Sequence, residues 1–193
     1  MKTIIKRRTW RAIYRLLDRV SPVDYDCGSL CGAACCMCED ADTVSGEESD
    51  YEMGIYLYPG EEKIHSRKED WLLWSVERAE DFEFPDSWIG NVYFVRCKTP
   101  PNCPREKRPF QCRTYPLTPH ITQEGLLTLI RNHEELPYTC PLISNHMDLN
   151  RDFVKATYTV WKHLLRDPLI YDLVEMDSRM REIYGEELEF EIL

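Results

Sequence analysis

Apolar residues recur at steps of three and four positions near the start of the chain, which is the spacing of one buried helix face. The pattern predicts a helix within residues 3–20, and Ser21-Pro22 ends it because proline disrupts a helix. The opposite face is basic. A basic amphipathic helix can lie on an anionic membrane, but a helix docked on its own core is the simpler interpretation. The apolar positions are Ile5, Trp10, Ile13, Tyr14, Leu16, Leu17 and Val20.

The C-terminal third carries the same helical period twice. Residues 149–166 predict one helix, which ends before Asp167-Pro168. Asp167 is expected to cap a second helix from Pro168 to Gly185, because an aspartate accepts hydrogen bonds from the first N–H groups and proline suits the first turn. We therefore expect a helical pair over residues 149–185.

Short apolar and aromatic runs between these helices predict strands. Ile55–Tyr58 precedes a Pro-Gly turn, residues 91–97 (NVYFVRC) are rich in aromatic side chains, and Leu126–Ile130 forms a third run. Residues 71–74 (WLLW) fit a strand or a helix, because so short a run does not define its own period. Helices at both ends and strands between them predict an α+β fold.

Composition and charge narrow the location and the partners. No apolar run approaches the roughly 20 residues that a transmembrane helix needs, and the first residues lack the apolar block of a signal peptide. We therefore expect a cytoplasmic protein with no transmembrane segment. A net charge of −10 disfavours nucleic acid as a partner, although residues 1–20 alone carry a net charge of +6.

Nine cysteines are the main chemical feature of the chain, and five of them fall within residues 27–38. Most residues between these five are glycine, alanine or serine, which allow the backbone to wrap closely around an ion. In a reducing cytoplasm, clustered thiols bind metal more often than they form disulfides. The cluster therefore predicts a metal site, and zinc and an iron–sulfur cluster fit it equally well.

A second cysteine group lies in a proline-rich, basic stretch. Four thiolates around Zn²⁺, or around a four-iron cluster of charge 2+, leave a net charge of −2 that nearby cations can offset. Arg108 and Arg113 flank Cys112 most closely, so we expect them to contact the metal-bound sulfurs. The cysteines of this part of the chain are Cys97, Cys103, Cys112 and, further on, Cys140.

Motifs of several common enzyme classes are absent from the sequence. The chain contains no GxGxxG, Walker, GxSxG or HExxH motif, so a dinucleotide site, a P-loop, a serine hydrolase and a common zinc protease have no support. The histidines are scattered, and we expect each at the surface or in the core rather than on a metal. They are His65, His120, His133, His146 and His163.

Two blocks of sequence resemble a known family. Residues 27–36 (CGSLCGAACC) are similar to a CxxCxxCC signature with each gap one residue longer, and residues 103–116 (CPREKRPFQCRTYP) are similar to a C…RPxxCRxxP block. These are features of the CxxCxxCC zinc- or iron-chelating domains, the YkgJ-like cysteine-cluster proteins, which include flagellin lysine N-methylases. Cys140-Pro141 resembles a trailing Cys-Pro of that family, whereas Cys38 has no counterpart.

The resemblance covers about residues 25–145 and implies a metal-binding domain. Together with the strand and helix patterns, it predicts one domain over residues 1–193, in which a small sheet and irregular cysteine-rich loops surround a metal centre. An N-terminal helix (1–22) and the C-terminal helical pair flank this core. The ligands that the resemblance implies are Cys27, Cys31, Cys35, Cys36, Cys97, Cys103, Cys112 and Cys140.

Three functions are compatible with such a centre. We favour a metal-binding protein that acts in electron transfer, redox sensing or metal handling. A protein lysine methyltransferase similar to the flagellin N-methylases is the second hypothesis, although no sequence resembling a nucleotide-binding loop supports it. An adaptor with structural zinc, which binds a protein partner through the basic N-terminal helix, is the third. The sequence leaves open whether the protein is an enzyme.

Overall fold

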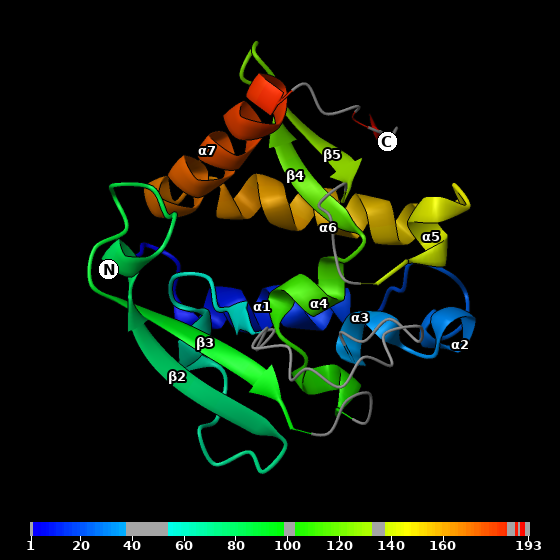
Figure 1. The fold of residues 1–193 in the computed structure, drawn as a ribbon, viewed down its shortest axis with the longest axis horizontal. Helices are drawn as coiled ribbons and strands as arrows, with labels where there is room; N and C mark the ends of the chain where they lie inside the picture. Colours follow the sequence, from blue (N-terminus) through cyan, green and yellow to red (C-terminus); the bar gives the residue numbers. More distant parts are fainter. Residues whose placement is uncertain are drawn as a thin grey trace, which may run out of the picture.

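The fold is α+β, as the sequence predicts, with helices at both ends of the chain and two small antiparallel sheets (Figure 1). The computed structural model describes residues 2–37, 54–98, 103–132, 138–184, 188 and 190–191. Cys38, His133 and the predicted helix end at Gly185 lie outside these residues. Among the helices of the described residues, none combines the length and apolar character needed to cross a bilayer.

Most cysteines of the described residues lie on short helices or at the ends of elements. The longer elements are α1 (Arg7–Leu17), β2 (Leu72–Arg78), β3 (Asn91–Cys97), β4 (Leu117–Ile121), β5 (Leu127–Arg131), α6 (Arg151–Leu164) and α7 (Pro168–Tyr184). The shorter ones are α2 (Gly28–Cys31), α3 (Ala34–Met37), β1 (Ile55–Tyr56), η1 (Glu61–Lys63), η2 (Ala79–Asp81), η3 (Arg105–Lys107), α4 (Phe110–Thr114), α5 (Pro141–Ser144) and β6 (Phe190–Glu191).

Helix α1 is shorter than the predicted span but buries the predicted face. Its four buried side chains recur at three- and four-residue steps, whereas Leu16, which the sequence pattern also included, is 37% exposed. The helix packs against α6 and reaches α4 and η1. The amphipathic pattern is therefore that of a helix docked on the core. The buried side chains are Trp10, Ile13, Tyr14 and Leu17.

The C-terminal helical pair, α6 and α7, is confirmed. Asp167 lies between the two helices, is fully buried and caps α7 by accepting a hydrogen bond from Leu169 N at 3.0 Å. Its other carboxylate oxygen accepts bonds from Ile4 N at 2.7 Å and from Thr3 Oγ1 at 2.5 Å. The cap that the sequence predicts therefore also anchors the N-terminal segment, which the sequence did not indicate.

The first sheet has the strand order β1-β3-β2 and is antiparallel throughout. Strand β2 pairs with β3 along its whole length, from Leu72 opposite Cys97 to Arg78 opposite Asn91. The ambiguous run 71–74 is thus the start of a strand, because this long-range pairing supplies what its local pattern lacks. The pairing also places Cys97 at the end of the sheet.

The second sheet has the strand order β4-β5-β6. The predicted run Leu126–Ile130 corresponds to β5, shifted by one residue. Strand β4 was not predicted, because Pro119 within it argues against a central strand; the strand lies at the sheet edge, where proline is tolerated. Helix α7 packs on β4, and Ile121 N donates to Ser178 Oγ at 2.9 Å.

An aromatic cluster joins the elements in the core. The ring of Phe110, the first residue of α4, lies 5.6 Å from the Trp10 ring, 5.6 Å from Tyr58 and 5.1 Å from Trp161. Phe110 has no solvent exposure. Edge-to-face contacts of this kind each add about 0.5–1.5 kcal/mol beyond the burial of apolar area. Helix α4 is therefore fixed to the core by its first residue.

Candidate metal centre

Most cysteines of the described residues lie on short helices or at element ends, whereas Cys103 lies in irregular chain before η3. This refines the predicted irregular loops: Gly32 and Ala33, both with φ of 61°, reverse the chain between α2 and α3 and allow two short helical turns. In Figure 1, α3 lies between α4 and α2, and α5 lies above α2. All eight are free thiols: Cys27, Cys31, Cys35, Cys36, Cys97, Cys103, Cys112 and Cys140.

Cys97 and Cys103 form a hydrogen-bonded pair at the end of the first sheet. Both pack against the apolar side chains around Trp71 and Leu72. Arg108 Nε donates a hydrogen bond to Cys103 Sγ at 3.1 Å. The hydrogen bond from Cys97, reinforced by Arg108, lowers the pKa of Cys103 to about 5, while the pKa of Cys97 rises because its proton is shared with Cys103.

Cys35 and Cys36 form a second hydrogen-bonded pair, on α3. Cys35 is exposed and Cys36 is half-buried. The hydrogen bond from Cys35 lowers the pKa of Cys36 to about 7, and the positive charge of Arg108 acts in the same direction. Arg108 therefore stabilises thiolates at two positions, Cys36 and Cys103, that are far apart in sequence.

Cys112 lies on α4, and one cysteine of each pair acts electrostatically on it. The pKa of Cys112 is raised to about 12, chiefly by burial and then by the negative charges of Cys36 and Cys103. The same charges, together with that of Cys112, contribute to the raised pKa of Cys97. Three segments thus bring four sulfurs within electrostatic reach of one another. We refer to Cys36, Cys97, Cys103 and Cys112 as the inner cysteine group.

The remaining cysteines lie around this group. Burial raises the pKa of Cys27, with Asp26, Cys140 and Cys31 adding smaller electrostatic effects. Cys27 and Cys140 precede α2 and α5, respectively, so two more segments meet here. The pKa of Cys35 is raised chiefly by its hydrogen bond to Cys36 and by burial, and the charges of Cys112 and Cys27 add smaller effects. Cys35 therefore lies within electrostatic reach of both the inner group and Cys27.

Arg113 has a different environment from Arg108. Its guanidinium lies over the Tyr14 ring, with 4.1 Å between Cζ and the ring centroid, and its Nε donates to the carbonyl of Arg108 at 2.7 Å. The other nitrogens donate to Asp18, the residue that follows α1, and to the carbonyl of Glu106. Its hydrogen bonds thus fix the segment between Cys103 and Cys112 to α1, whereas Arg108 bonds to a sulfur directly.

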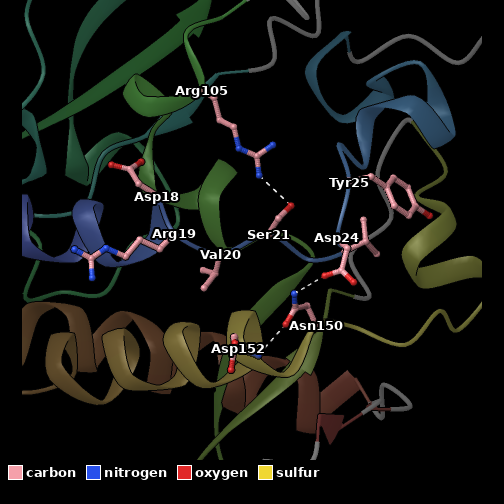
Figure 2. Close-up of a pocket in the computed structure, with 10 residues that line it drawn as sticks. Asp18, Arg19, Val20, Ser21, Asp24, Tyr25, Arg105, Asn150 and Asp152 are labelled. Atoms are coloured by element: carbon pink, nitrogen blue, oxygen red, sulfur yellow. Dashed lines mark hydrogen bonds between the residues drawn. The ribbon is translucent and has the colours of Figure 1, made fainter.

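An open pocket of about 350 Å³ borders the cysteine region. Figure 2 shows it between the C-terminal end of α1, the segment leading to α2, η3 and the start of α6. Arg105 Nη2 donates to Ser21 Oγ at 3.0 Å, and Asn150 Nδ2 donates to Asp24 Oδ1 at 2.9 Å. These bonds hold the chain that enters α2 against η3 and α6, and so position the segment that carries Cys27.

The sulfurs of the inner cysteine group do not form a complete metal coordination site in this structure. Among the residues that the structure describes, no three His, Cys, Asp or Glu side chains form a group ready to hold a metal ion. His120 is in the core, at 2% exposed, and His65 is half-buried with a side chain that is 5% exposed, so both agree with the expected surface or core positions.

Sequence reasoning missed one residue close to the centre, Glu61. It follows a Pro-Gly turn and precedes another acid, which is typical of a solvated surface loop, yet it is 1% exposed. Phe110 N donates to Glu61 Oε1 at 2.8 Å, so the carboxylate contacts the start of the helix that carries Cys112. Only the folded chain reveals this contact, because no local pattern marks a buried carboxylate.

No protein-family model, curated protein or solved structure matches the chain. The resemblance to the YkgJ-like family therefore stays a prediction from the two cysteine blocks.

Proposed function

We propose that the protein is a cytoplasmic metal-binding protein whose inner cysteine group holds zinc or an iron–sulfur cluster, with a role in redox chemistry or metal handling. The observation that supports this proposal is that the thiols of Cys36, Cys97, Cys103 and Cys112, which come from three separate segments, act electrostatically on one another's pKa values. Thiolate is the preferred ligand of structural zinc and of iron–sulfur clusters. The four cysteines therefore supply the type of ligand that these metals bind in proteins.

The charge around the group suits a bound metal. Four thiolates on Zn²⁺ or on a four-iron cluster leave a negative centre, which hydrogen bonds to sulfur and nearby cations stabilise. Arg108 lies 3.1 Å from Cys103 Sγ and provides such a bond. When bound, zinc would act as a structural centre or Lewis acid, whereas an iron–sulfur cluster would supply electron transfer.

The arrangement of the thiols is compatible with assembly on metal binding. Metal sites in small domains rarely exist fully formed before the metal arrives, because binding drives the last ordering of the ligands. Cys27, Cys31, Cys35 and Cys140 lie around the inner group and could replace one of its members or serve a second ion. The residues present therefore fit a thiolate-bound metal, and metal analysis decides which sulfurs are used.

The location and partners follow from the same chemistry. Free thiols persist in a reducing compartment, so the cysteines of the described residues fit the cytoplasm. The net charge of −10 favours a metal ion or a protein as the partner over nucleic acid.

The decisive experiment is metal analysis, with an absorption spectrum, of the full chain purified without oxygen. Iron with acid-labile sulfide and a broad absorption near roughly 400 nm would identify a cluster and lead to a redox titration. Stoichiometric zinc in a colourless protein would identify a zinc site. A chain that holds neither metal, and that binds neither after anaerobic reconstitution with zinc or with iron and sulfide, contradicts the proposal.

A further inference from the structure

Glu61 is a buried carboxylate with a full set of hydrogen-bond donors. Tyr14 Oη donates to its Oε1 at 2.5 Å, and Tyr58 N donates to its Oε2 at 3.0 Å. Phe110 N donates to Oε1 at 2.8 Å, and His65 Nε2 lies 3.5 Å from the same oxygen. A buried carboxylate is costly unless it is bonded in this way, so each donor must be in place for the fold to tolerate it.

The donors come from different parts of the molecule. Tyr14 belongs to α1, Tyr58 follows β1, and Phe110 begins α4. The Tyr14 hydroxyl also contacts His65 Nε2 at 2.8 Å. The single carboxylate of Glu61 therefore fixes where α1, the first sheet and α4 meet.

The contact with α4 connects Glu61 to the cysteines. Phe110 is two residues before Cys112, so the hydrogen bond to Phe110 N fixes the start of the five-residue helix that carries this sulfur. A shift at the first residue of so short a helix moves the whole helix. Glu61 thus acts on the position of Cys112 through one backbone hydrogen bond.

A second connection runs through Tyr14. The guanidinium of Arg113 lies over the Tyr14 ring and donates to the carbonyl of Arg108, whose own side chain donates to Cys103 Sγ. The Tyr14 hydroxyl is held by Glu61. The carboxylate therefore supports both Cys112 and the arginine that contacts Cys103.

We propose that Glu61 is a positioning residue of the thiolate centre: it holds α4 and Tyr14 so that Cys112 and Cys103 meet one metal. This inference rests on the proposed metal-binding function and goes beyond it by assigning a carboxylate that touches no sulfur. Substitution of a residue that orients a metal ligand without contacting the metal typically weakens metal affinity about 10- to 100-fold. We expect a loss of this size on substitution of Glu61.

The substitution Glu61→Gln tests this role with little change in volume. A Gln amide keeps one oxygen acceptor but places an NH₂ group where the second carboxylate oxygen meets a donor. Tyr14→Phe removes a single donor and leaves the charge of Glu61 unchanged, so it separates the hydrogen bond from the charge. We expect a loss of metal affinity of about 10- to 100-fold for Glu61→Gln and a smaller loss for Tyr14→Phe.

Asp167→Asn provides a matched control. Asp167 is also fully buried and also accepts hydrogen bonds from an N-terminal segment and from the start of a helix. Its partners are Thr3, Ile4 and Leu169, none of which belongs to the cysteine region. This variant reproduces the loss of a buried carboxylate without disturbing α4.

The measurement is a titration of the reduced, metal-free full chains with Zn²⁺ against a chelator, repeated with Co²⁺ as a spectroscopic probe. We expect Glu61→Gln to bind Zn²⁺ more weakly and to change the Co²⁺ absorption, whereas Asp167→Asn matches the unmodified protein even where it melts at a lower temperature. Equal affinities and spectra for Glu61→Gln and the unmodified chain would overturn the inference, as would equal losses in Glu61→Gln and Asp167→Asn. An unmodified chain that binds neither Zn²⁺ nor Co²⁺, and that takes up no iron–sulfur cluster on anaerobic reconstitution with iron and sulfide, would instead refute the metal-binding function itself.

Discussion

Arg108 Nε lies 3.1 Å from Cys103 Sγ and donates a hydrogen bond to it. The two residues are only five positions apart, but Arg108 also acts electrostatically on Cys36, which belongs to a different segment. One guanidinium therefore favours the thiolate form of sulfurs from both cysteine blocks. This relationship can be tested before any metal is added.

Arg108→Gln is expected to raise the pKa of Cys103, because it removes a charged donor that favours the thiolate. The pKa of about 5 should move toward the ordinary thiol value of roughly 8.5. The measurement is the rate of alkylation of Cys103 as a function of pH in the metal-free, reduced chain, followed by mass spectrometry of the peptide. Lys107→Gln is the control, because it removes a neighbouring positive charge that bonds to Glu69 instead. An unchanged midpoint in Arg108→Gln would contradict the assignment.

Cys112→Ala is expected to lower the metal content and the stability of the protein as isolated, because loss of a ligand removes binding free energy that contributes to folding. A loss of about 2 kcal/mol would lower Tm by roughly 4–8 °C in a chain of this size. The measurements are metal per chain and thermal unfolding before and after chelation, which should bring the two proteins closer together. Cys38→Ala is the control: Cys38 has no counterpart in the YkgJ-like proteins that the chain resembles, so this variant should keep its metal. Unchanged metal stoichiometry and Tm in Cys112→Ala would refute the role.

Glu69→Gln is expected to destabilise the protein in a pH-dependent manner. Hydrogen bonds from Lys107 Nζ and then from Trp71 Nε1 hold the pKa of Glu69 below its usual range. Because the folded-state pKa is the lower one, the carboxylate stabilises the fold above the unfolded-state pKa of roughly 4.3, and this contribution is lost as pH falls through the folded-state pKa.

Thermal unfolding at pH 7, 5 and 3 checks the sign of this effect. The difference in Tm between Glu69→Gln and the unmodified chain should be largest at pH 7, should shrink at pH 3, and should decrease in high salt because the pair is partly exposed. The exposed Glu83 offers a control substitution, Glu83→Gln. A difference that persists unchanged at pH 3 would show that packing, not the charge of Glu69, is responsible.

Gly60→Ala is expected to be strongly destabilising, because Gly60 has a φ of +89° and a Cβ there would lie 3.0–3.1 Å from Thr3, Ile5 and Trp10. The left-handed conformation alone costs a non-glycine residue about 1–3 kcal/mol. Gly125→Ala supplies the control: its φ is +78°, but a Cβ there meets nothing within 4 Å. Chemical denaturation of both variants separates conformational cost from steric contact. Equal losses would show that the contacts around Gly60 relax freely.

The long helices could be predicted from the sequence because each buries one continuous face. Helix α1 keeps its buried side chains at helical spacing, and the pair after residue 149 carries its own cap in Asp167. The local hydrophobic pattern was therefore enough to predict these helices. The strands depended more on partners: β2 is largely exposed along its length and is a strand because β3 pairs with all of it.

The candidate centre could be predicted only in part. Cysteine spacing marked the residues that gather, but not the way that Arg108 and Arg113 divide their roles between a sulfur and α1. Glu61 gave no signal, because a carboxylate becomes buried through donors that lie 47 and 49 positions away in sequence. Such long-range hydrogen bonds cannot be inferred from composition or periodicity.

The inner cysteine group joins segments that lie far apart in the chain, with the whole first sheet between Cys36 and Cys112. A metal bound by both residues would act as a crosslink and would close a loop of residues 36–112. In the chain-entropy description of crosslinks, closure of a loop of this length reduces the freedom of the unfolded chain by roughly 4.5 kcal/mol. The lifetime of the protein in a cell would then follow the local supply of metal, since starvation for the ion would release the loop and expose the chain to proteolysis.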